Sequence, residues 1–400
     1  MGILRYTPSQ ETTKETVNAG KNILLLGKPG TGKTELIKDI CEEQTAKGKK
    51  VLITASTGLA ASNFDGGRTI HSVLRWNPNG GDLDLWVCSR DLGSADILII
   101  DEVSMLGTDI LNHLVNCLNY VDHKPQLILS GDFFQLPPVT PRGYIRRYPF
   151  ENRNWNALGL TTCFLEEIVR QRDPEFKLML EKAMIGDTSC IPYFNERSQR
   201  KIIEGAITLC TRNNLADKIN KKKMALLPGS AKIYYAVGEC GKVDFNKIRV
   251  EECLSVKKHM RVMSLRNDPS ERYQNGSLGT VMDMNENVIT VRFDNCVEVE
   301  IRRIPYLVEA KGYAGKEIKI EQFPLRGGYA ISIHKSQGQT FDAVNIMAPS
   351  CWDPGQLYVA LSRARTIDGI HLMEPIVAKS LFADQKVINY YKSLYEGFAV

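Results

Sequence analysis

The segment GKPGTGKT, at residues 27–34, constrains the fold of this chain more than any other stretch of its 400 residues. It follows the apolar run NILLL at residues 22–26 and precedes the helix-like segment ELIKDICEEQ. The pattern G-x-x-x-x-G-K-[ST] between a strand and a helix is typical of a phosphate-binding loop. Its glycines let backbone N–H groups wrap the phosphates, and the N-terminus of the helix faces the anion. The sequence therefore predicts a site for ATP and Mg²⁺, in which Lys33 reaches the β- and γ-phosphates and Thr34 holds the metal. The predicted ATP-binding residues of this loop are Gly27, Pro29, Gly30, Thr31, Gly32, Lys33 and Thr34.

Short apolar runs recur along the chain, and each is followed by polar or glycine-rich residues. Continuous runs of this length indicate strands that are buried on both faces. Because helix-like stretches lie between several of them, they predict parallel α/β sheets. The runs form two sets, which predicts two α/β units that meet near residue 168. The first set is Asn22–Leu26, Lys50–Ala55, Asp96–Ile100, Gln126–Leu129 and Cys163–Glu167; the second is Ala206–Thr211, Tyr329–Ile333, Ala343–Ala348 and Gly369–Glu374.

Each predicted unit contains an interruption. Residues 63–92 are rich in Gly, Asn, Asp and Trp and lack strand-like runs. Residues 270–325 alternate apolar and polar side chains between turn signals such as Asn275-Gly276, a pattern that predicts an antiparallel β insert. The predicted domains are thus residues 1–168 with the 63–92 insert, and residues 169–400 with the 270–325 insert.

The composition is that of an ordinary globular chain with a mild basic excess. Lysine and arginine number 51 against 46 acidic residues, so the formal net charge is +5, which suits a nucleic-acid partner without requiring one. The ten cysteines are scattered, and none has the spacing of a zinc site. Free thiols in a reducing intracellular compartment are expected. No signal peptide and no apolar stretch of roughly 20 residues is present, so a membrane span is not expected.

Two further strand ends carry the chemistry that a bound triphosphate needs. In LIIDEVSM, Asp101 can hold Mg²⁺ and Glu102 can orient and deprotonate the attacking water. The alternative is an acidic pair that caps the next helix. In LSGDFFQLPPV, Gln135 can sense the γ-phosphate, and the alternative is a surface amide in a loop.

Taken together, the motifs of this chain resemble superfamily 1 helicases of the B branch, most closely the PIF family of DNA helicases and more distantly RecD and Dda. The resemblance extends from about residue 10 to residue 366. It is carried by GKPGTGKT, TASTGLAA (Thr54–Ala61), TIHSVL (Thr69–Leu74), IIDEVSM, LSGDFFQLPPV, EIVRQRDPEF (Glu167–Phe176), ISIHKSQGQT (Ile331–Thr340) and YVALSRART (Tyr358–Thr366).

The resemblance implies two RecA-like lobes with ATP in the cleft between them, a wedge-type insert in the first lobe and a small antiparallel β-barrel insert in the second. It implies that Gln10 reads the adenine and that Gly338 backs the nucleotide. Arg170 and Arg363 would approach the γ-phosphate, where a guanidinium stabilises the charge of the transferring group. The implied catalytic residues are therefore Glu102, Gln135, Arg170 and Arg363.

The resemblance also implies a path for single-stranded DNA across both lobes. Hydroxyls and backbone amides suit phosphate contacts, which position a strand without reading its sequence. The residues implied as DNA contacts are Ser56, Thr57, His71, His334 and Lys335. Phe133, Phe134 and Trp76 are candidates for stacking on bases, with packing inside the protein as the alternative. The basic runs Lys221–Lys223 and Arg302–Arg303 could touch phosphates, although solvated faces are the more common explanation for such runs.

The function predicted from these features is that of an ATP-dependent DNA helicase that moves 5′ to 3′ on single-stranded DNA and unwinds duplex or forked DNA. Its polarity and its action as a monomer follow from the resemblance alone, as do roles in DNA repair, recombination and telomere maintenance. The alternative is a DNA-stimulated ATPase that translocates but unwinds little. A small-molecule kinase leaves IHKSQGQT and both arginine motifs unexplained, and a non-catalytic subunit is disfavoured by the intact Lys33, Asp101 and Glu102.

The motif YVALSRART contains two arginines, and only one is expected to reach the nucleotide. Asp353 as N-cap, Pro354 at the first helical position and Gln356 at the third predict a helix that runs through both arginines. At about 100° per residue, Arg363 and Arg365 would fall on opposite flanks of that helix. The motif alignment favours Arg363.

Overall fold

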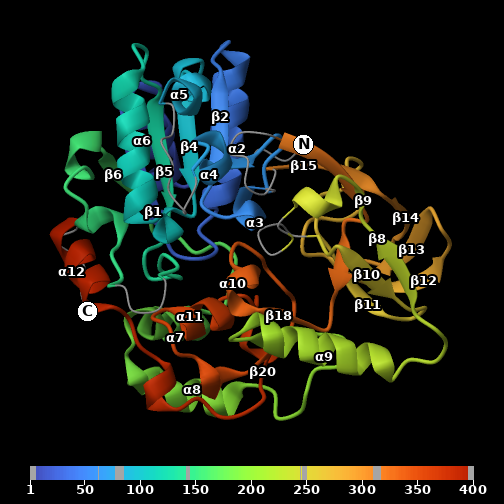
Figure 1. Cartoon of the computed structure of the whole chain (residues 1–400). Helices are drawn as coiled ribbons and strands as arrows, with labels where there is room; N and C mark the ends of the chain where they lie inside the picture. The colour runs from blue at the N-terminus through green and yellow to red at the C-terminus, as the bar shows by residue number, and fades with distance from the viewer. Residues whose placement is uncertain are drawn as a thin grey trace. The chain divides into compact units, whose positions relative to one another are not determined.

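The computed structural model of the chain describes residues 6–61, 63–76, 85–140, 145–243, 245, 250–309 and 317–394 (Figure 1). Contacts divide the chain into two compact units. The first comprises Met1–Arg197, Cys351–Ile367 and Ile376–Val400, and the second comprises Ser198–Ser350 and Asp368–Pro375. Each unit contains its own parallel sheet, so the predicted α/β class is confirmed.

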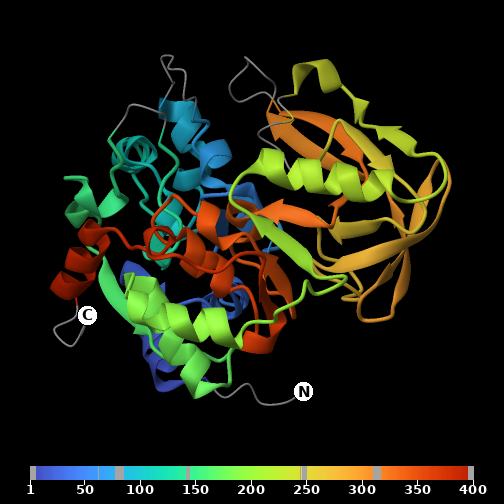
Figure 2. The ribbon, with the colours of Figure 1, turned by 90° about the horizontal axis from the view of Figure 1, so that it is seen from below.

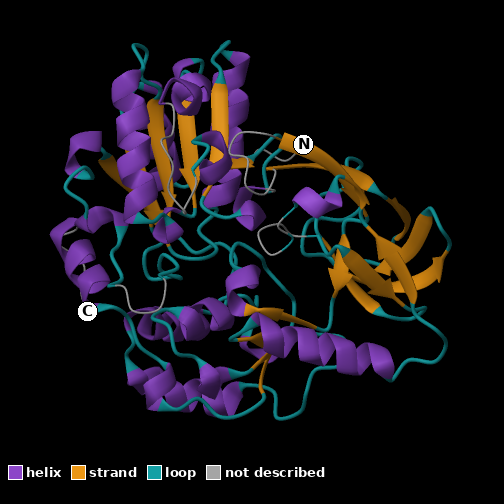
Figure 3. Ribbon diagram, viewed as in Figure 1, coloured by secondary structure: helices purple, strands orange, loops and turns teal. Residues whose placement is uncertain are grey.

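The sheet of the first unit has six parallel strands in the order β3-β2-β4-β5-β1-β6. Helices cover both of its faces (Figure 3). In β1, Ile23 and Leu25 pack with helix α2, whereas Leu24 and Leu26 belong to the core that contains α6. This is why the predicted runs are continuously apolar. The strands are β1 (Ile23–Gly27), β2 (Val51–Ala55), β3 (Arg68–Thr69), β4 (Ile97–Asp101), β5 (Gln126–Gly131) and β6 (Thr161–Leu165).

The helices of the first unit come from both ends of the chain. Eight of the described α-helices come from Met1–Arg197, and two more come from the C-terminal segments. They are α1 (Pro8–Asn18), α2 (Lys33–Ala46), α3 (Gly58–Ala61), α4 (Ile70–Val73), α5 (Leu85–Gly93), α6 (Thr108–Tyr120), α7 (Pro174–Ile185), α8 (Ile191–Arg197), α11 (Gln356–Leu361) and α12 (Gln385–Leu394).

The second unit contains a four-stranded parallel sheet in the order β18-β7-β19-β20. Each strand matches a run of the predicted second set. Helix α9 (Asn213–Ala225) packs beside β18 and extends along the antiparallel strands of the same unit (Figure 2). The parallel strands are β7 (Ile207–Cys210), β18 (Ala330–Ser332), β19 (Val344–Ile346) and β20 (Ile370–Leu372), and the short helix α10 (Ile333–Ser336) follows β18.

The rest of the second unit is antiparallel, as predicted for residues 270–325, although its strands begin earlier, at Lys232. Five strands pair in the order β14-β13-β12-β11-β17, three in the order β15-β16-β9, and β10 pairs with β8. The bounds are β8 (Lys232–Tyr235), β9 (Val237–Gly238), β10 (Cys253–Val256), β11 (Arg261–Ser264), β12 (Leu278–Met284), β13 (Val288–Phe293), β14 (Glu298–Arg302), β15 (Ile304–Glu309), β16 (Glu317–Gln322) and β17 (Leu325–Gly327).

The predicted insert at residues 63–92 is described in two pieces. Residues 63–76 contain β3 and α4, and α5 begins at Leu85. Residues 77–84, the centre of the predicted wedge, lie outside the described residues. The wedge therefore stays a prediction.

The contact units do not follow the predicted boundary at residue 168. Residues up to Arg197 pack with the first unit, and the chain returns to it in Cys351–Ile367 and again from Ile376. The two RecA-like lobes predicted at residues 1–168 and 169–400 stay a prediction. The return of the chain to the first unit after the second was not predicted. Sequence periodicity indicates where helices and strands lie, but it does not indicate which unit a later helix packs against.

The helix predicted through both arginines is wrong in extent. Helix α11 begins at Gln356, with Gly355 as its N-cap in a left-handed conformation, and ends at Leu361. Asp353 is instead ion-paired with Arg146. Arg363 and Arg365 both lie beyond the helix, so their separation is set by the turn that follows and not by helical geometry.

Candidate nucleotide-hydrolysis site

The phosphate-binding loop lies between β1 and α2, where it was predicted. Gly30 and Gly32 adopt φ angles of 84° and 83°, a left-handed conformation that glycine adopts without strain. The ammonium of Lys33 donates hydrogen bonds to the carbonyls of Gly27 (2.5 Å) and Lys28 (3.1 Å). Burial lowers the pKa of Lys33, and the carboxylates of Asp132, Glu102 and Asp101 oppose that shift.

Arg170 packs directly on this loop. The backbone N–H groups of Val169 and Arg170 donate to the carbonyl of Gly30, at 2.8 and 3.1 Å. A Cβ at Gly30 would lie 2.5 Å from the Cβ of Arg170, so this close approach requires glycine. Burial lowers the pKa of Arg170 to about 9, and the positive charges of Arg363 and Arg365 lower it further. Arg170 therefore lies close to both the loop and Arg363.

Asp101 is the last residue of β4 and Glu102 follows it; both are buried, with 4% and 8% of their surface exposed. Burial raises the pKa of Asp101, and the adjacent charge of Glu102 raises it further. Glu102 has φ 54° and ψ 46°, a left-handed conformation that costs a non-glycine residue about 1–3 kcal/mol. Its side chain makes no capping hydrogen bond to the 3₁₀ turn Val103–Met105. The alternative role of Glu102 as a helix cap is therefore not supported.

Gln135 is buried rather than exposed in a surface loop. Only 4% of its surface is accessible, and its Nε2 lies 3.4 Å from the carboxylate of Asp132. Its Oε1 is buried and, among the residues that the structure describes, has no hydrogen-bond partner. Asp132 was not singled out in the sequence, although a carboxylate directly after a buried strand was the available signal.

Arg363 and Arg365 differ sharply in environment. Arg363 is 1% exposed, and its guanidinium donates to the Val359 carbonyl (2.9 Å) and the Ser362 hydroxyl (3.0 Å). Burial lowers the pKa of Arg363, and the negative charge of Glu102 opposes this most strongly. Arg365 is exposed. Of the two arginines, Arg363 is the one that is buried and electrostatically coupled to Glu102.

Gln171 is a second buried residue of this site that the sequence did not reveal. Its Nε2 donates to the carbonyls of Ser362 (3.5 Å) and Ala364 (3.0 Å), the two neighbours of Arg363 in the chain. The sequence signal was its position directly after Arg170. Gln171 thereby fixes the backbone on both sides of Arg363.

Gln10 lies against the phosphate-binding loop. It occupies the third position of α1, where it forms a reciprocal capping box with Thr7. Its Nε2 donates to the carbonyl of Thr31 at 3.4 Å. This places Gln10 beside the nucleotide site, while its role as the adenine reader stays a prediction.

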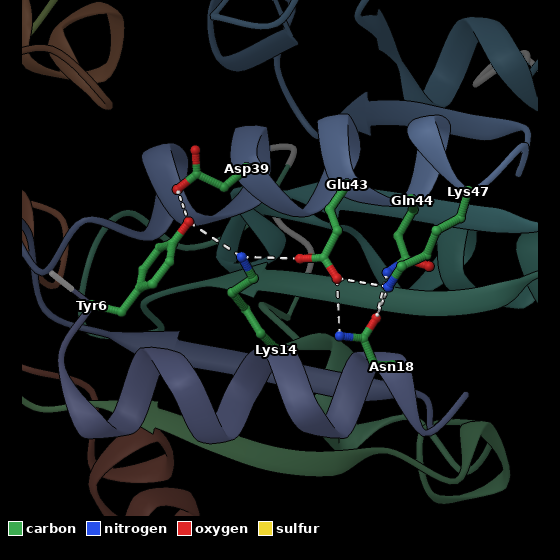
Figure 4. Close-up of polar contacts among 7 residues, drawn as sticks. All are labelled: Tyr6, Lys14, Asn18, Asp39, Glu43, Gln44 and Lys47. Atoms are coloured by element: carbon green, nitrogen blue, oxygen red, sulfur yellow. Dashed lines mark hydrogen bonds and ion pairs between the residues drawn. The ribbon is translucent and has the colours of Figure 1, made fainter. Parts of the chain in front are cut away.

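A polar network joins α1 to α2 and so holds Gln10 near the loop (Figure 4). Glu43 is its centre: its carboxylate is 3.0 Å from Lys14, 2.7 Å from Lys47 and 3.0 Å from the Asn18 amide. These partners lower the pKa of Glu43 to about 2, with the contribution of Lys47 the largest. The network is completed by Tyr6, Asp39 and Gln44.

Three of the predicted DNA contacts lie near the same edge of the six-stranded sheet. Ser56 follows β2, and its N–H donates to the Asp101 carbonyl (3.0 Å). The Thr57 hydroxyl accepts the N–H of Ala60 (3.1 Å) at the start of α3. His71 lies in α4, and burial lowers its pKa. The loops of this edge are therefore structurally tied to Asp101, and contact with DNA stays a prediction.

For Phe133 and Phe134, the structure favours the alternative of packing inside the protein over stacking on bases. Phe133 is 1% exposed and packs edge-on against Phe150 (5.1 Å between ring centroids), while Phe134 is 3% exposed and contacts Tyr391 (4.7 Å). Both rings belong to the core of the first unit. Trp76 is only partly buried, and its ring lies 5.4 Å from that of His113.

The remaining predicted site residues belong to the second unit. His334 and Lys335 lie in α10, and Gly338 follows with φ 77°. Burial lowers the pKa of Lys335, and the neighbouring charge of Arg326 lowers it further. The roles of these residues stay predictions.

The two basic runs also lie in the second unit. Arg303 donates to the Tyr235 carbonyl (2.7 Å) and lies 4.9 Å from the ring of Phe323, so it serves this unit's own packing. Lys221–Lys223 are exposed in α9.

The described residues contain no group of three or more His, Cys, Asp or Glu side chains that could hold a metal ion by themselves. None of the helices described is long and apolar enough to cross a membrane.

The parallel sheet with its glycine loop, the buried Asp101-Glu102 pair and the buried arginines define a P-loop nucleoside triphosphatase. Residues 5–205 match the family model described as AAA domain, and residues 327–366 match the UvrD-like helicase C-terminal domain. The ATP-dependent DNA helicase Pif1 of Bdellovibrio bacteriovorus is 33% identical over 98% of this chain and 93% of its own length. The chain belongs to the Pif1 family of ATP-dependent DNA helicases and is accordingly an enzyme that uses ATP.

Other relatives show the same relationship. The ATP-dependent DNA helicase PIF1 of Danio rerio is 32% identical over 98% of this chain, which spans 64% of that longer protein. The crystal structure of the Pif1 helicase from Candida albicans superposes on this chain with a TM-score of 0.84 and 28% identity. The match covers 98% of this chain and 100% of that structure. The Pif1 helicase from Bacteroides, crystallised with ADP-AlF3 and single-stranded DNA, has a TM-score of 0.76 and 30% identity, with 99% of this chain and 98% of that structure covered.

The network around Glu43 predicts a specific dependence of stability on pH. Because the folded pKa of Glu43 is lowered to about 2, its stabilisation is present above the ordinary glutamate pKa of about 4.3 and is lost as the pH falls towards the folded value. Glu43→Gln should therefore lower the melting temperature at pH 6, and the difference from wild type should shrink between about pH 4.3 and pH 2. Thermal unfolding followed by circular dichroism measures it. A difference that is constant across this range would show that the charge of Glu43 does not stabilise the fold.

Proposed function

We propose that this chain couples ATP hydrolysis to 5′-to-3′ movement along single-stranded DNA and thereby unwinds duplex or forked DNA. The observation that carries the proposal is the cluster of buried charges of the first unit. Lys33, Arg170 and Arg363 lie close enough to Glu102 for its charge to act on all three. The chain is also similar to a Pif1 helicase along nearly its whole length. Together, these observations support ATP hydrolysis that is coupled to movement on DNA.

Within the proposed reaction, each side chain has a distinct task. Glu102 orients and deprotonates the attacking water, and Gln135 senses the γ-phosphate. Lys33 binds the β- and γ-phosphates, while Arg170 and Arg363 stabilise the negative charge that spreads over the transferring group. Because these groups are buried, their electrostatic effect on the phosphates is stronger than it would be in water.

The residues present also suit a magnesium ion. Mg²⁺ is held in such sites by one or two protein oxygens together with substrate phosphates, which agrees with a donor set of only the Thr34 hydroxyl and the buried Asp101 carboxylate. When bound, the ion would neutralise phosphate charge. Thr34 and Asp101 would hold it at the start of α2 and the end of β4.

The proposed coupling of hydrolysis to movement rests on the order in which the chain passes between the two units. Arg363 belongs to Cys351–Ile367, a segment of the first unit that is preceded by Ser350 and followed by Asp368 of the second. The segment that carries Arg363 is therefore tethered to the second unit at both ends. A displacement of that unit would pull on the arginine and so change hydrolysis, and hydrolysis would in turn displace the unit.

The DNA path proposed here runs over the predicted contacts Ser56, Thr57 and His71 of the first unit and His334 and Lys335 of the second. The polarity and a monomeric state rest on the resemblance to the family. A translocase that unwinds little remains the second candidate, since the centre of the predicted wedge is not among the described residues.

Polarity and unwinding are tested together on DNA duplexes that carry either a 5′ or a 3′ single-stranded tail. We expect ATP-dependent strand separation from the 5′-tailed duplex, measured by release of a fluorescent strand. A duplex without a tail is the control. Unwinding from 3′ tails alone would contradict the polarity, and DNA-stimulated ATP turnover without strand separation would favour the second candidate.

Replacing Glu102 by Gln should retain ATP binding and slow hydrolysis by about two to four orders of magnitude, because general-base catalysis typically contributes that much. Binding of a fluorescent ATP analogue and phosphate release measure the two properties separately. Lys33→Ala serves as the comparison, since it should weaken binding as well. A normal turnover rate in Glu102→Gln would exclude this residue as the base.

The two arginines of YVALSRART form a matched pair for a third test. Arg363→Ala should reduce the kcat of DNA-stimulated ATP hydrolysis by about a hundredfold or more, because it removes a buried cation from the site. Arg365→Ala removes an exposed cation two residues away and should change kcat by less than about threefold. Steady-state kinetics at saturating DNA compares them. The reverse ranking would overturn the assignment of Arg363.

A further inference from the structure

The carboxylate of Asp132, directly after β5, is surrounded by hydrogen-bond donors from three parts of the chain. It is 1% exposed. Its Oδ1 accepts the N–H of Phe134 (3.0 Å) and lies 3.4 Å from the hydroxyl of Tyr391. Its Oδ2 lies 3.4 Å from both the Gln135 amide nitrogen and the Tyr358 hydroxyl. A buried carboxylate needs such donors, because an unpaired charge is costly away from water.

This arrangement fixes which way the Gln135 side chain points. A carboxylate accepts hydrogen bonds, so the NH₂ end of Gln135 must face Asp132. The carbonyl Oε1 then points away from Asp132, and among the described residues it finds no donor although it is buried. An acceptor in that position suits a water molecule or another donor that arrives with the substrate.

The two tyrosines bring distant elements to the same carboxylate. Tyr358 lies in α11, five residues before Arg363. Tyr391 lies in the C-terminal helix α12, and its hydroxyl also accepts the N–H of Phe133 (3.3 Å). Tyr391 therefore contacts the loop that carries Gln135 through both a side chain and the backbone.

Helix α12 is held in place independently of these contacts. The ring of Tyr390 stacks on Phe150 with 4.1 Å between centroids, and its hydroxyl accepts the indole N–H of Trp155 (3.0 Å). Tyr148 donates to Asp384 just before the helix (3.2 Å). The helix is thus anchored by contacts that do not involve the hydroxyl of Tyr391.

We propose that Asp132 is a positioning residue for Gln135 and that the hydroxyls of Tyr391 and Tyr358 hold Asp132, so that Tyr391 of the C-terminal helix supports the ATPase site. The inference rests on the proposed role of Gln135 at the γ-phosphate. Loss of the Tyr391 hydroxyl would let the carboxylate turn and release the amide of Gln135. The effect falls on the transition state, where the orientation of Gln135 matters, and not on the binding of ATP.

The test uses Tyr391→Phe in the full chain, which keeps the ring against Phe134 and removes only the hydroxyl. We expect kcat for hydrolysis stimulated by single-stranded DNA to fall by about tenfold while KM for ATP stays within about twofold. Affinity for ADP with aluminium fluoride should fall in parallel with kcat, while affinity for ADP alone should not change. Tyr358→Phe should show the same pattern, since it removes the other hydroxyl from the same carboxylate.

Tyr390→Phe is the matched control, because it removes a hydroxyl from the adjacent position of the same helix without touching Asp132. It should lower the melting temperature by leaving the Trp155 N–H without its acceptor, and kcat should stay at the wild-type value. A wild-type kcat in Tyr391→Phe, or an equal loss of kcat in Tyr390→Phe, would overturn the inference and leave the proposed function standing. Absence of DNA-stimulated hydrolysis in the wild-type chain would overturn the proposed function and this inference with it.

Discussion

The structure of the first unit depends on a balance of buried charge. Three cations, Lys33, Arg170 and Arg363, are held together with three carboxylates, those of Asp101, Glu102 and Asp132, in a region from which water is largely excluded. Removing any one charge would leave another without compensation, which is costly in such surroundings. Three local features of the backbone bring these groups close together. They are the glycines of the phosphate-binding loop, the left-handed conformation of Glu102 and the turn after α11.

The sequence predicted the parts of the site that are local in the chain. The phosphate-binding loop and the Asp101-Glu102 pair each lie at the carboxyl end of a buried strand, and parallel strands bring these ends to one edge of the sheet. Gln135 was predicted by the same reasoning, and Arg170 only from the resemblance of its motif to the family. Asp132 and Gln171 were missed because their importance comes from partners more than 180 residues away, and no spacing in the sequence reports such contacts.

Where the prediction failed, a tertiary contact had replaced a local preference. Asp353 has the sequence of a helix cap, but an ion pair with Arg146 takes its carboxylate and α11 starts three residues later. Phe133 and Phe134 could have faced a nucleic acid, yet the C-terminal tyrosines bury them. In both cases, the segment that decided the outcome lies far away in the chain.

The order of the segments along the chain also determines when the candidate nucleotide-hydrolysis site can form during synthesis. The six strands of the first sheet are complete once residue 165 has emerged, and a growing chain folds its N-terminal parts first. Arg363, however, appears only after Ser198–Ser350 of the second unit has been made, and Tyr391 only after the whole of that unit. Until then Asp132 and Phe134 would lack their contacts with Tyr391, and Phe133 its contact with Tyr390, so a nascent or C-terminally truncated chain would present an incomplete apolar surface. In the proposed mechanism, which uses Arg363, ATP hydrolysis would therefore require segments that are made only after Ser350.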